Sequence, residues 1–308
     1  MFLVFDVGGT FTKYGLIDIR GNILEKSKFP TENKNGLEPF VDSLVKIYEQ
    51  YKDKKIEGIA LSVPGAVDVE KGIVYNGGGV PFLHEVCIKE VLSKRCDGIN
   101  VSVENDGKSA ALSEVWLGNA KNVNDAVVYV FGSGIGGAIV KDRKIHRGNR
   151  LIAGEVSNLI THYTKEDLQN KTSPIPGLWV YDGSAYIMCL KVARQKGLDD
   201  NSVTGEQVFK WASEGDKICL NVLDNMYFEI AKQIYNTQYF FDPDIVLIGG
   251  GISEQPVFIE GIKKYIDEFS KLEHQFAKPV VDVCKFNNDS NLLGALYNHL
   301  CLNHLINE

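Results

Sequence analysis

Two glycine-rich turns, each between runs that read as β-strands, constrain the fold of this chain more than any other feature. The first turn, at Gly8 and Gly9, follows the apolar run 2–5 and leads into a second run at 14–17. The second turn, 132–137, is likewise flanked by apolar, strand-like runs. Glycine has no Cβ, so backbone N–H groups in such turns can come close to a phosphate. The repetition predicts two similar halves whose glycine turns face each other across a cleft.

Polar side chains flank the first turn. Asp6 precedes the glycines, Thr10 follows them and Lys13 comes soon after. A carboxylate at this position is suited to hold a metal ion, directly or through water, beside bound phosphates. The hydroxyl of Thr10 and the charge of Lys13 are further groups that phosphates attract.

The second turn also satisfies the dinucleotide-binding pattern G-x-G-x-x-G. That pattern requires a helix directly after the glycines, because the pyrophosphate binds at the helix N-terminus. Here the following residues, 138–145, read as a strand and a turn. We therefore reject a Rossmann domain, and the chain contains no Walker A sequence.

Composition bounds the class of protein. The length of 308 residues predicts about two domains, and 44% hydrophobic with 24% charged residues is ordinary for a globular protein. The net charge of −7 argues against nucleic acid as a partner. We expect no membrane association, because no apolar run is long enough to span a bilayer. Six scattered cysteines and an N-terminus without a basic segment predict a cytoplasmic protein with reduced thiols.

The first half reads as strands and helices in the order β, β, β, α, β. Further along we expect helices at 85–94, 108–117, 184–195, 205–214, 216–240, 257–269 and 292–299, with strands at 99–103, 244–248 and 280–284. Asn105 and Asp106 stand between the strand 99–103 and the helix 108–117. Ligands bind at such strand ends, and a carboxylate there can take a proton from an alcohol. Either residue could equally cap the helix, so both interpretations stay open.

The glycines within 76–79 suggest backbone that lies close to a ligand or to another strand. A flexible loop is the alternative. These residues alone do not choose between them.

Six blocks in order resemble the ROK family of sugar kinases and related repressors. They are Asp6-x-Gly8-Gly9-Thr10, Pro64-Gly65-x-Val67-Asp68, Glu104-Asn105-Asp106 with Ala110-Ala111-Leu112, the turn at 132–137, Ala153-Gly154-Glu155, and 242–251. The resemblance covers nearly the whole chain. It implies an α/β protein with two RNase H-like domains of the actin/hexokinase-like ATPase fold and an interdomain cleft. The first domain would comprise 1–118 plus 290–308, and the second 119–289.

The resemblance also implies an ATP-dependent carbohydrate kinase, with a small-molecule sugar as partner and Mg²⁺ beside the phosphates. Asp106 would be the general base that deprotonates the sugar hydroxyl, and Asp6 the metal ligand. The residues that would hold ATP are Asp6, Gly8, Gly9, Thr10, Lys13, Ser133 and Gly134 at the phosphates, and Gly249, Gly250 and Gly251 at the adenosine. The residues that would contact the sugar are Gly65, Asn105, Asp106, Glu155 and Asn158. Family members are commonly homodimers, so the resemblance implies a homodimer here.

The sequence departs from the family at its zinc site. The family's zinc-binding histidine is replaced by Asn158, and 171–182 contains no cysteine. His162 has no cysteine partners, so we expect no structural zinc. Val180 aligns with a second sugar-binding glutamate of the family, and Asp182 is near but not equivalent. Family members that lack the zinc motif include β-glucoside kinases, so the resemblance implies phosphorylation of the 6-hydroxyl of a hexose or a β-glucoside. Fewer groups at the anomeric end would admit the substituent of a β-glucoside. N-acetylmannosamine is the alternative sugar.

Two other functions remain to be weighed against the kinase. A repressor of this family carries an N-terminal DNA-binding extension, whereas here the ATPase pattern begins at the first residues and the charge is acidic. A catalytically silent sugar-binding protein would keep the fold and lose the chemistry. Retention of Asp6, Thr10, Asp106 and Ser133 argues against this alternative, while Asn158 and Val180 argue for it.

Overall fold

The computed structural model describes residues 1–32, 36–171, 177–272 and 277–306. These residues form two compact units, and each has its own five-stranded sheet. The first unit comprises Met1–Lys121, Arg147–Ala153 and Asn288–Glu308, and the second comprises Asn122–His146 and Gly154–Asn287. The sequence analysis placed 147–153 in the second domain, but this segment groups with the first unit, where Arg147 binds a glutamate of the sheet.

The sheet of the first unit has the strand order β3-β2-β1-β4-β8. Its strands are β1 (Phe2–Val7), β2 (Phe11–Ile17), β3 (Ile23–Pro30), β4 (Gly58–Val63) and β8 (Val101–Asn105). Strand β2 is antiparallel to β1 and β3, while β1, β4 and β8 are parallel. The carboxyl ends of the three parallel strands therefore lie at one edge of the sheet, where α/β proteins bind ligands.

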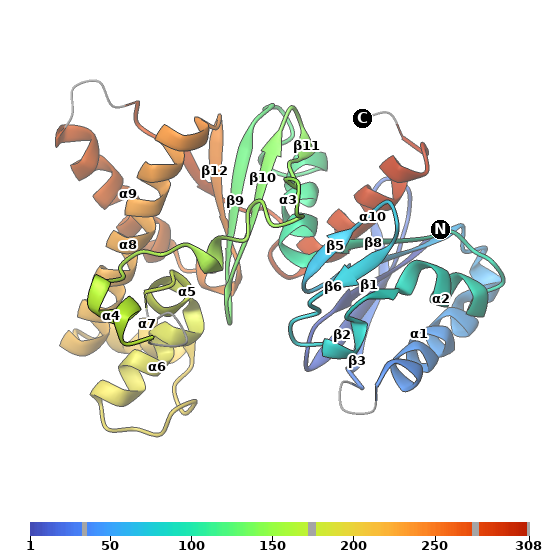
Figure 1. Ribbon diagram of the computed structural model, residues 1–308, viewed down its shortest axis with the longest axis horizontal. Helices are drawn as coiled ribbons and strands as arrows, with labels where there is room; N and C mark the ends of the chain where they lie inside the picture. The colour runs from blue at the N-terminus through green and yellow to red at the C-terminus, as the bar shows by residue number, and fades with distance from the viewer. Residues whose placement is uncertain (33–35, 172–176, 273–276, 307–308) are drawn as a thin grey trace. The chain divides into compact units, whose positions relative to one another are not determined.

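Helices cover both faces of this sheet (Figure 1). Helices α1 (Leu37–Tyr51) and α2 (Ile88–Arg95) pack on one face and share a hydrophobic cluster with alternate residues of β1. Helices α3 (Asp106–Trp116) and α10 (Ser290–Leu302) pack against the sheet as well as against each other. All residues of β1, β4 and β8 are consequently buried, which explains why β1 and β4 read as almost continuous apolar runs in the sequence.

A small antiparallel sheet follows β4. It is formed by β5 (Ala66–Asp68), β6 (Ile73–Tyr75) and β7 (Val86–Cys87). The helix predicted at 85–94 was wrong at its start, because Val86 and Cys87 pair with β6 and the helix α2 begins only at Ile88. The strand predicted at 99–103 is shifted to Val101–Asn105, since its backbone pairs with β4 up to Asn105.

The second unit repeats the strand order of the first, as β11-β10-β9-β12-β13. Its strands are β9 (Ala126–Phe131), β10 (Ile135–Lys141), β11 (Lys144–Ile145), β12 (Ile245–Gly249) and β13 (Val281–Val283). Strand β10 is antiparallel to β9 and β11, and β9, β12 and β13 are parallel. Both glycine-rich turns therefore join antiparallel strands, and the rejection of a Rossmann domain is confirmed.

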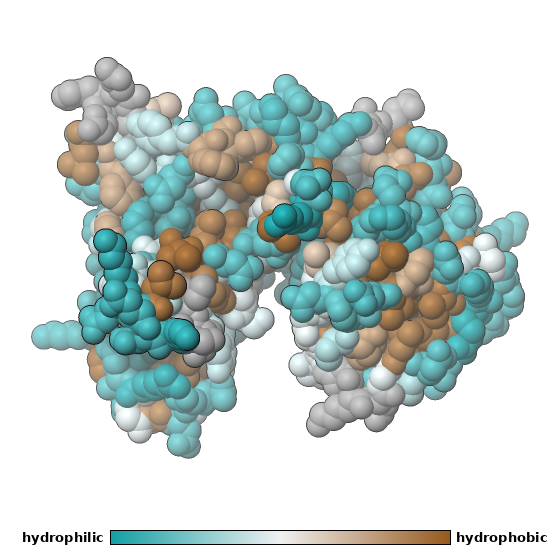
Figure 2. Space-filling view, viewed as in Figure 1, coloured by the Kyte–Doolittle hydropathy of each residue, from teal (hydrophilic) through white to brown (hydrophobic). Residues whose placement is uncertain are grey.

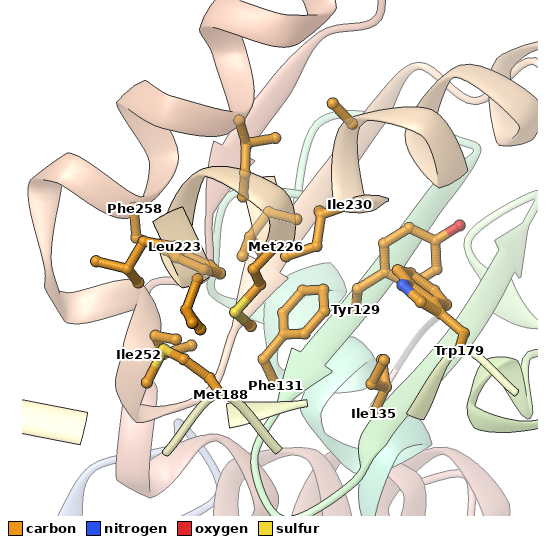
Figure 3. Close-up of a cluster of buried hydrophobic side chains, with 14 of the residues drawn as sticks. Tyr129, Phe131, Ile135, Trp179, Met188, Leu223, Met226, Ile230, Ile252 and Phe258 are labelled. Atoms are coloured by element: carbon orange, nitrogen blue, oxygen red, sulfur yellow. The ribbon is translucent and has the colours of Figure 1, made fainter. Parts of the chain in front are cut away.

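The helices of the second unit are α4 (Lys165–Gln169), α5 (Val180–Gly183), α6 (Ala185–Gln195), α7 (Gly205–Ser213), α8 (Lys217–Phe241) and α9 (Pro256–Leu272). In its core, Phe131 packs edge-to-face with both Trp179 and Phe258, and Met226 and Ile230 of α8 complete the cluster (Figure 3). The rings fix α5, α8 and α9 relative to β9. Figure 2 shows a face with many hydrophilic residues and brown hydrophobic patches between them. Leu168 is among the exposed large hydrophobic residues. No helix in the described ranges is long and apolar enough to cross a bilayer.

Candidate active site

The first glycine turn, between β1 and β2, is held by a threonine that the sequence analysis missed. The N–H of Gly8 donates to the carbonyl oxygen of Phe11 at 3.1 Å. Thr31, which follows β3, donates from Oγ1 to the carbonyl oxygen of Gly8 at 2.6 Å and from its N–H to that of Thr10 at 2.9 Å. The backbone that would face phosphates is thus fixed by hydrogen bonds.

The glycines at 76–79 lie against this same turn. A Cβ at Gly9 would lie 3.3 Å from the carbonyl oxygen of Gly79, and a Cβ at Gly79 would lie 3.3 Å from the Cα of Gly9. The sequence analysis left open what the backbone of 76–79 lies close to, and the structure shows that Gly79 lies close to the first glycine turn. Side chains at either position would push the two segments apart.

Asp6 lies near the carboxyl end of β1 and is 9% exposed. Its Oδ1 accepts a hydrogen bond of 3.0 Å from Nδ2 of Asn291 on α10. Its Oδ2 lies 3.6 Å from Nζ of Lys13 on β2. A single oriented carboxylate suits Mg²⁺, which takes most of its remaining ligands from water and substrate phosphates. Among the described residues, no group of three or more His, Cys, Asp or Glu side chains is arranged to hold a metal ion.

Asn105 and Asp106 join β8 to α3, and the structure separates their roles. Asn105 is the N-cap: its Oδ1 accepts from the N–H of Lys108 at 3.0 Å. Its Nδ2 donates at 2.9 Å both to the carbonyl oxygen of Gly65 and to Oδ1 of Asp106. The same Oδ1 of Asp106 accepts from the N–H of Gly107 at 2.8 Å. Asp106 is thus the first residue of the helix, half-buried, with an oriented carboxylate at the positive end of the helix dipole.

Gly65 lies in the short loop between β4 and β5. Its φ is +101°, and a Cβ there would lie 2.5 Å from the carbonyl oxygen of Asn76 and 2.8 Å from that of Tyr75. Only glycine fits this position. Its carbonyl oxygen is thereby presented to Asn105, which links the loop after β4 to the start of α3.

In the second unit, the turn between β9 and β10 is closed by Ser157, a residue that the sequence analysis did not single out. Ser157 Oγ accepts from the N–H of Ile135 at 3.0 Å and donates to its carbonyl oxygen at 2.8 Å. Ser133 at the tip of the turn is exposed, and a Cβ at Gly134 would lie 3.5 Å from Oγ of Ser157. The serine therefore fixes the turn on which Ser133 and Gly134 are carried.

The glycines after β12 adjoin this turn. Gly250 has a φ of +92°, and a Cβ there would lie 2.1 Å from the carbonyl oxygen of Phe131, the last residue of β9. A Cβ at Gly249 would lie 3.0 Å from Sγ of Cys284, whereas one at Gly251 would have no atom within 4 Å. The structure thus places Gly250 against Phe131, which directly precedes the 132–134 turn, and leaves space beside Gly251.

The predicted sugar residues of the second unit lie around a short 3₁₀ helix, η3 (Val156–Asn158). Glu155 directly precedes it and is half-buried, while Asn158 is exposed. Val180 begins α5, and its Cγ2 would lie 4.0 Å from a Cβ at Gly134. These residues belong to the second unit, whereas Gly65, Asn105 and Asp106 belong to the first.

His162 lies beside Asp182. Its Nδ1 lies 3.2 Å from Oδ2 of Asp182, whose Oδ1 lies 3.2 Å from Nζ of Lys191. Thr161 donates to Oδ2 of Asp182 at 3.1 Å. The part of 171–182 that covers 172–176 lies outside the described residues.

The repeated strand order identifies each unit as an RNase H-like domain, and two such domains in one chain make the actin/hexokinase-like ATPase fold. A family model, described as the ROK family, matches residues 3–300. The chain therefore belongs to the ROK family.

Three relatives illustrate this membership. A β-glucoside kinase from Listeria monocytogenes is 28% identical over 298 residues, which are 96% of each chain. A β-glucoside kinase from Klebsiella pneumoniae is 29% identical over 293 residues, covering 95% of this chain and 94% of the relative. A ROK family protein from Streptococcus pneumoniae, solved in complex with sucrose, superposes with a TM-score of 0.87 at 29% identity over 99% of both chains.

Proposed function

We propose that this protein is an ATP-dependent sugar kinase in which Asp106 is the general base. The observation that carries the proposal is the setting of the Asp106 carboxylate at the first position of α3. Two N–H donors, from Gly107 and from the side chain of Asn105, orient its Oδ1. Both donors and the helix dipole favour the charged form, which is the form that accepts a proton from a sugar hydroxyl.

The remaining chemistry of phosphoryl transfer is positioning and charge neutralisation, and the chain offers groups for both. The turn at Gly8, Gly9 and Thr10 is held by hydrogen bonds and would present its backbone to the phosphates, and Lys13 supplies a positive charge. Ser133 and Gly134 form the corresponding turn of the second unit. The glycines 249–251, next to that turn, would border the adenosine.

Asp6 is the residue that would hold Mg²⁺. Its carboxylate is oriented by Asn291 and lies beside the first glycine turn. The ion would supply charge neutralisation for the phosphates of ATP.

We further propose a β-glucoside or hexose as the acceptor, phosphorylated at its 6-hydroxyl. Gly65 and Asn105 in the first unit, with Glu155 and Asn158 in the second, would contact the sugar. The names of the Listeria and Klebsiella relatives support a β-glucoside. Val180 and Asn158 also support it, because a valine and an exposed amide bind an anomeric hydroxyl less strongly than the family's glutamate and histidine, and so tolerate a substituent there.

The proposal is tested by ADP release with ATP and Mg²⁺ over a panel of free hexoses, N-acetylhexosamines and β-glucosides, including cellobiose, gentiobiose and arbutin. We expect the highest kcat/KM with the β-glucosides. A clear preference for N-acetylmannosamine would overturn the substrate class but keep the kinase. Calorimetric binding of ATP and a sugar without any turnover would instead indicate a catalytically silent binding protein.

A further inference from the structure

Glu104 is a fully buried carboxylate directly before Asn105 and the proposed base Asp106. It lies on β8, and its side chain has no exposed surface. Its Oε1 accepts a hydrogen bond of 2.8 Å from the N–H of Asn105. A buried charge is costly unless an opposite charge and hydrogen bonds compensate it, so its partner is essential to this part of the molecule.

That partner is Arg147. Nη1 of its guanidinium donates to Oε1 of Glu104 at 2.9 Å and Nη2 donates to Oε2 at 2.6 Å, which is a bidentate pair. The Arg147 side chain is 22% exposed. Both carboxylate oxygens of Glu104 are thus hydrogen-bonded, and the ion pair lies one residue before Asn105.

Arg147 belongs to a turn that is flanked in the sequence, on both sides, by residues of the second unit. The segment 147–153 groups with the first unit, while His146 and Gly154 belong to the second. The turn is closed by a hydrogen bond of 3.2 Å from the N–H of Ala153 to the carbonyl oxygen of Arg147. Its last residue is followed by Gly154 and then by Glu155. Arg147 therefore binds the strand β8, which ends directly before the proposed base Asp106.

We propose that Arg147 is a positioning residue for phosphoryl transfer and acts through Glu104. The guanidinium fixes Glu104, Glu104 fixes the backbone N–H of Asn105, and Asn105 holds both Gly65 and the Asp106 carboxylate. Loss of Arg147 leaves a buried, uncompensated negative charge beside the base and releases this chain of hydrogen bonds. This inference rests on the proposed function of Asp106.

The kinetic test compares Arg147→Met with the wild-type protein. We expect kcat to fall about 100-fold, as for a displacement of a reacting group by about 1 Å, while the KM for ATP stays that of the wild type. Arg147→Lys keeps the charge but cannot make the bidentate pair, so its kcat should lie between those of Arg147→Met and the wild type. Arg194→Met is the matched control, because Arg194 makes a similar bidentate pair with Asp200 on the exposed surface.

Rescue separates positioning from a general loss of stability. Adding Glu104→Gln to Arg147→Met removes the uncompensated charge, and we expect kcat to recover part of its loss. Wild-type kcat in Arg147→Met would overturn the inference. So would equal losses of kcat in the single and double variants together with equal losses of thermal stability.

Hydrogen–deuterium exchange tests the same chain of contacts without turnover. We expect the amides of Asn105 and Lys108 to exchange faster in Arg147→Met than in the wild type or in Arg194→Met. Unchanged exchange would overturn the inference even if the kinase activity stands. If the wild-type protein phosphorylates no sugar, the proposed function fails, and the exchange result still decides whether Arg147 orders Asn105.

Discussion

Gly65→Ala should damage both the stability of the first unit and its affinity for sugar. Gly65 has a φ of +101°, and a left-handed conformation costs an alanine about 1 kcal/mol. The new Cβ would also lie 2.5 Å from the carbonyl oxygen of Asn76 and 2.8 Å from that of Tyr75, so backbone must move, which adds about 2 kcal/mol. The sum of about 3 kcal/mol corresponds to a fall in Tm of about 8 °C.

The matched control is Gly98→Ala. Gly98 has a φ of +76° in the same unit, but a Cβ there would have no atom within 4 Å. This variant isolates the backbone cost and should lower Tm by only about 3 °C. Differential scanning calorimetry measures both values.

The backbone shift at Gly65 should also weaken the hydrogen bond from Nδ2 of Asn105 to its carbonyl oxygen. A loss of about 1 kcal/mol would raise the KM for the sugar about fivefold, with the KM for ATP unchanged. Gly98→Ala should leave both constants unchanged. Equal losses of Tm in the two variants, with an unchanged KM for the sugar, would refute the reasoning.

Three further variants test other contacts. Burial lowers the pKa of His299 to about 4, so the unfolded state binds a proton from about pH 6.5 downwards while the folded state does not. The contribution of His299 to the free energy of unfolding is therefore complete above pH 6.5 and falls by about 3 kcal/mol towards pH 4. In urea unfolding, His299→Gln should lose less stability than the wild type over this pH range. An acid loss as large as in the wild type would contradict this. Ser157→Ala removes both hydrogen bonds to Ile135 and should raise the KM for ATP about fivefold but not the KM for the sugar; a selective effect on the sugar would count against it. Asn291→Ala removes the hydrogen bond to Oδ1 of Asp6 and should raise the Mg²⁺ concentration required for half-maximal rate, whereas an unchanged requirement would speak against Asp6 as the metal ligand.

The two hairpins and most helices could be predicted from the sequence because their signals are local. Glycines between two apolar runs indicate a turn between strands, and the long helix α8 shows its apolar stripe over 25 residues. The position of Asn105 between a strand and a helix was also readable, although the sequence alone could not separate the cap from the base.

The small sheet β5–β7 could not be predicted, because its strands have only two or three residues and no alternation of polar and apolar side chains. The contact between Gly9 and Gly79 was invisible for a related reason. A glycine signals that backbone comes close to something, but the partner is set by the tertiary fold.

The supporting side chains of the candidate site were missed because their partners are remote in the sequence. Asn291 is 285 residues from Asp6, and Arg147 is 43 residues from Glu104. A glutamate before Asn105 gives no sign in the sequence that it is fully buried, and an arginine in a turn is usually solvated. Only the three-dimensional structure brings these charges together.

The most direct test of the central claim is the kcat of Asp106→Asn with the preferred sugar, ATP and Mg²⁺. Asparagine can still accept the hydrogen bonds from Asn105 and Gly107 but cannot take up the proton of the hydroxyl. We predict a loss of kcat of at least about 1,000-fold, with sugar binding by calorimetry retained, whereas Asp53→Asn on the exposed surface should behave as the wild type. An Asp106→Asn variant that keeps the wild-type kcat would show that Asp106 is not the general base.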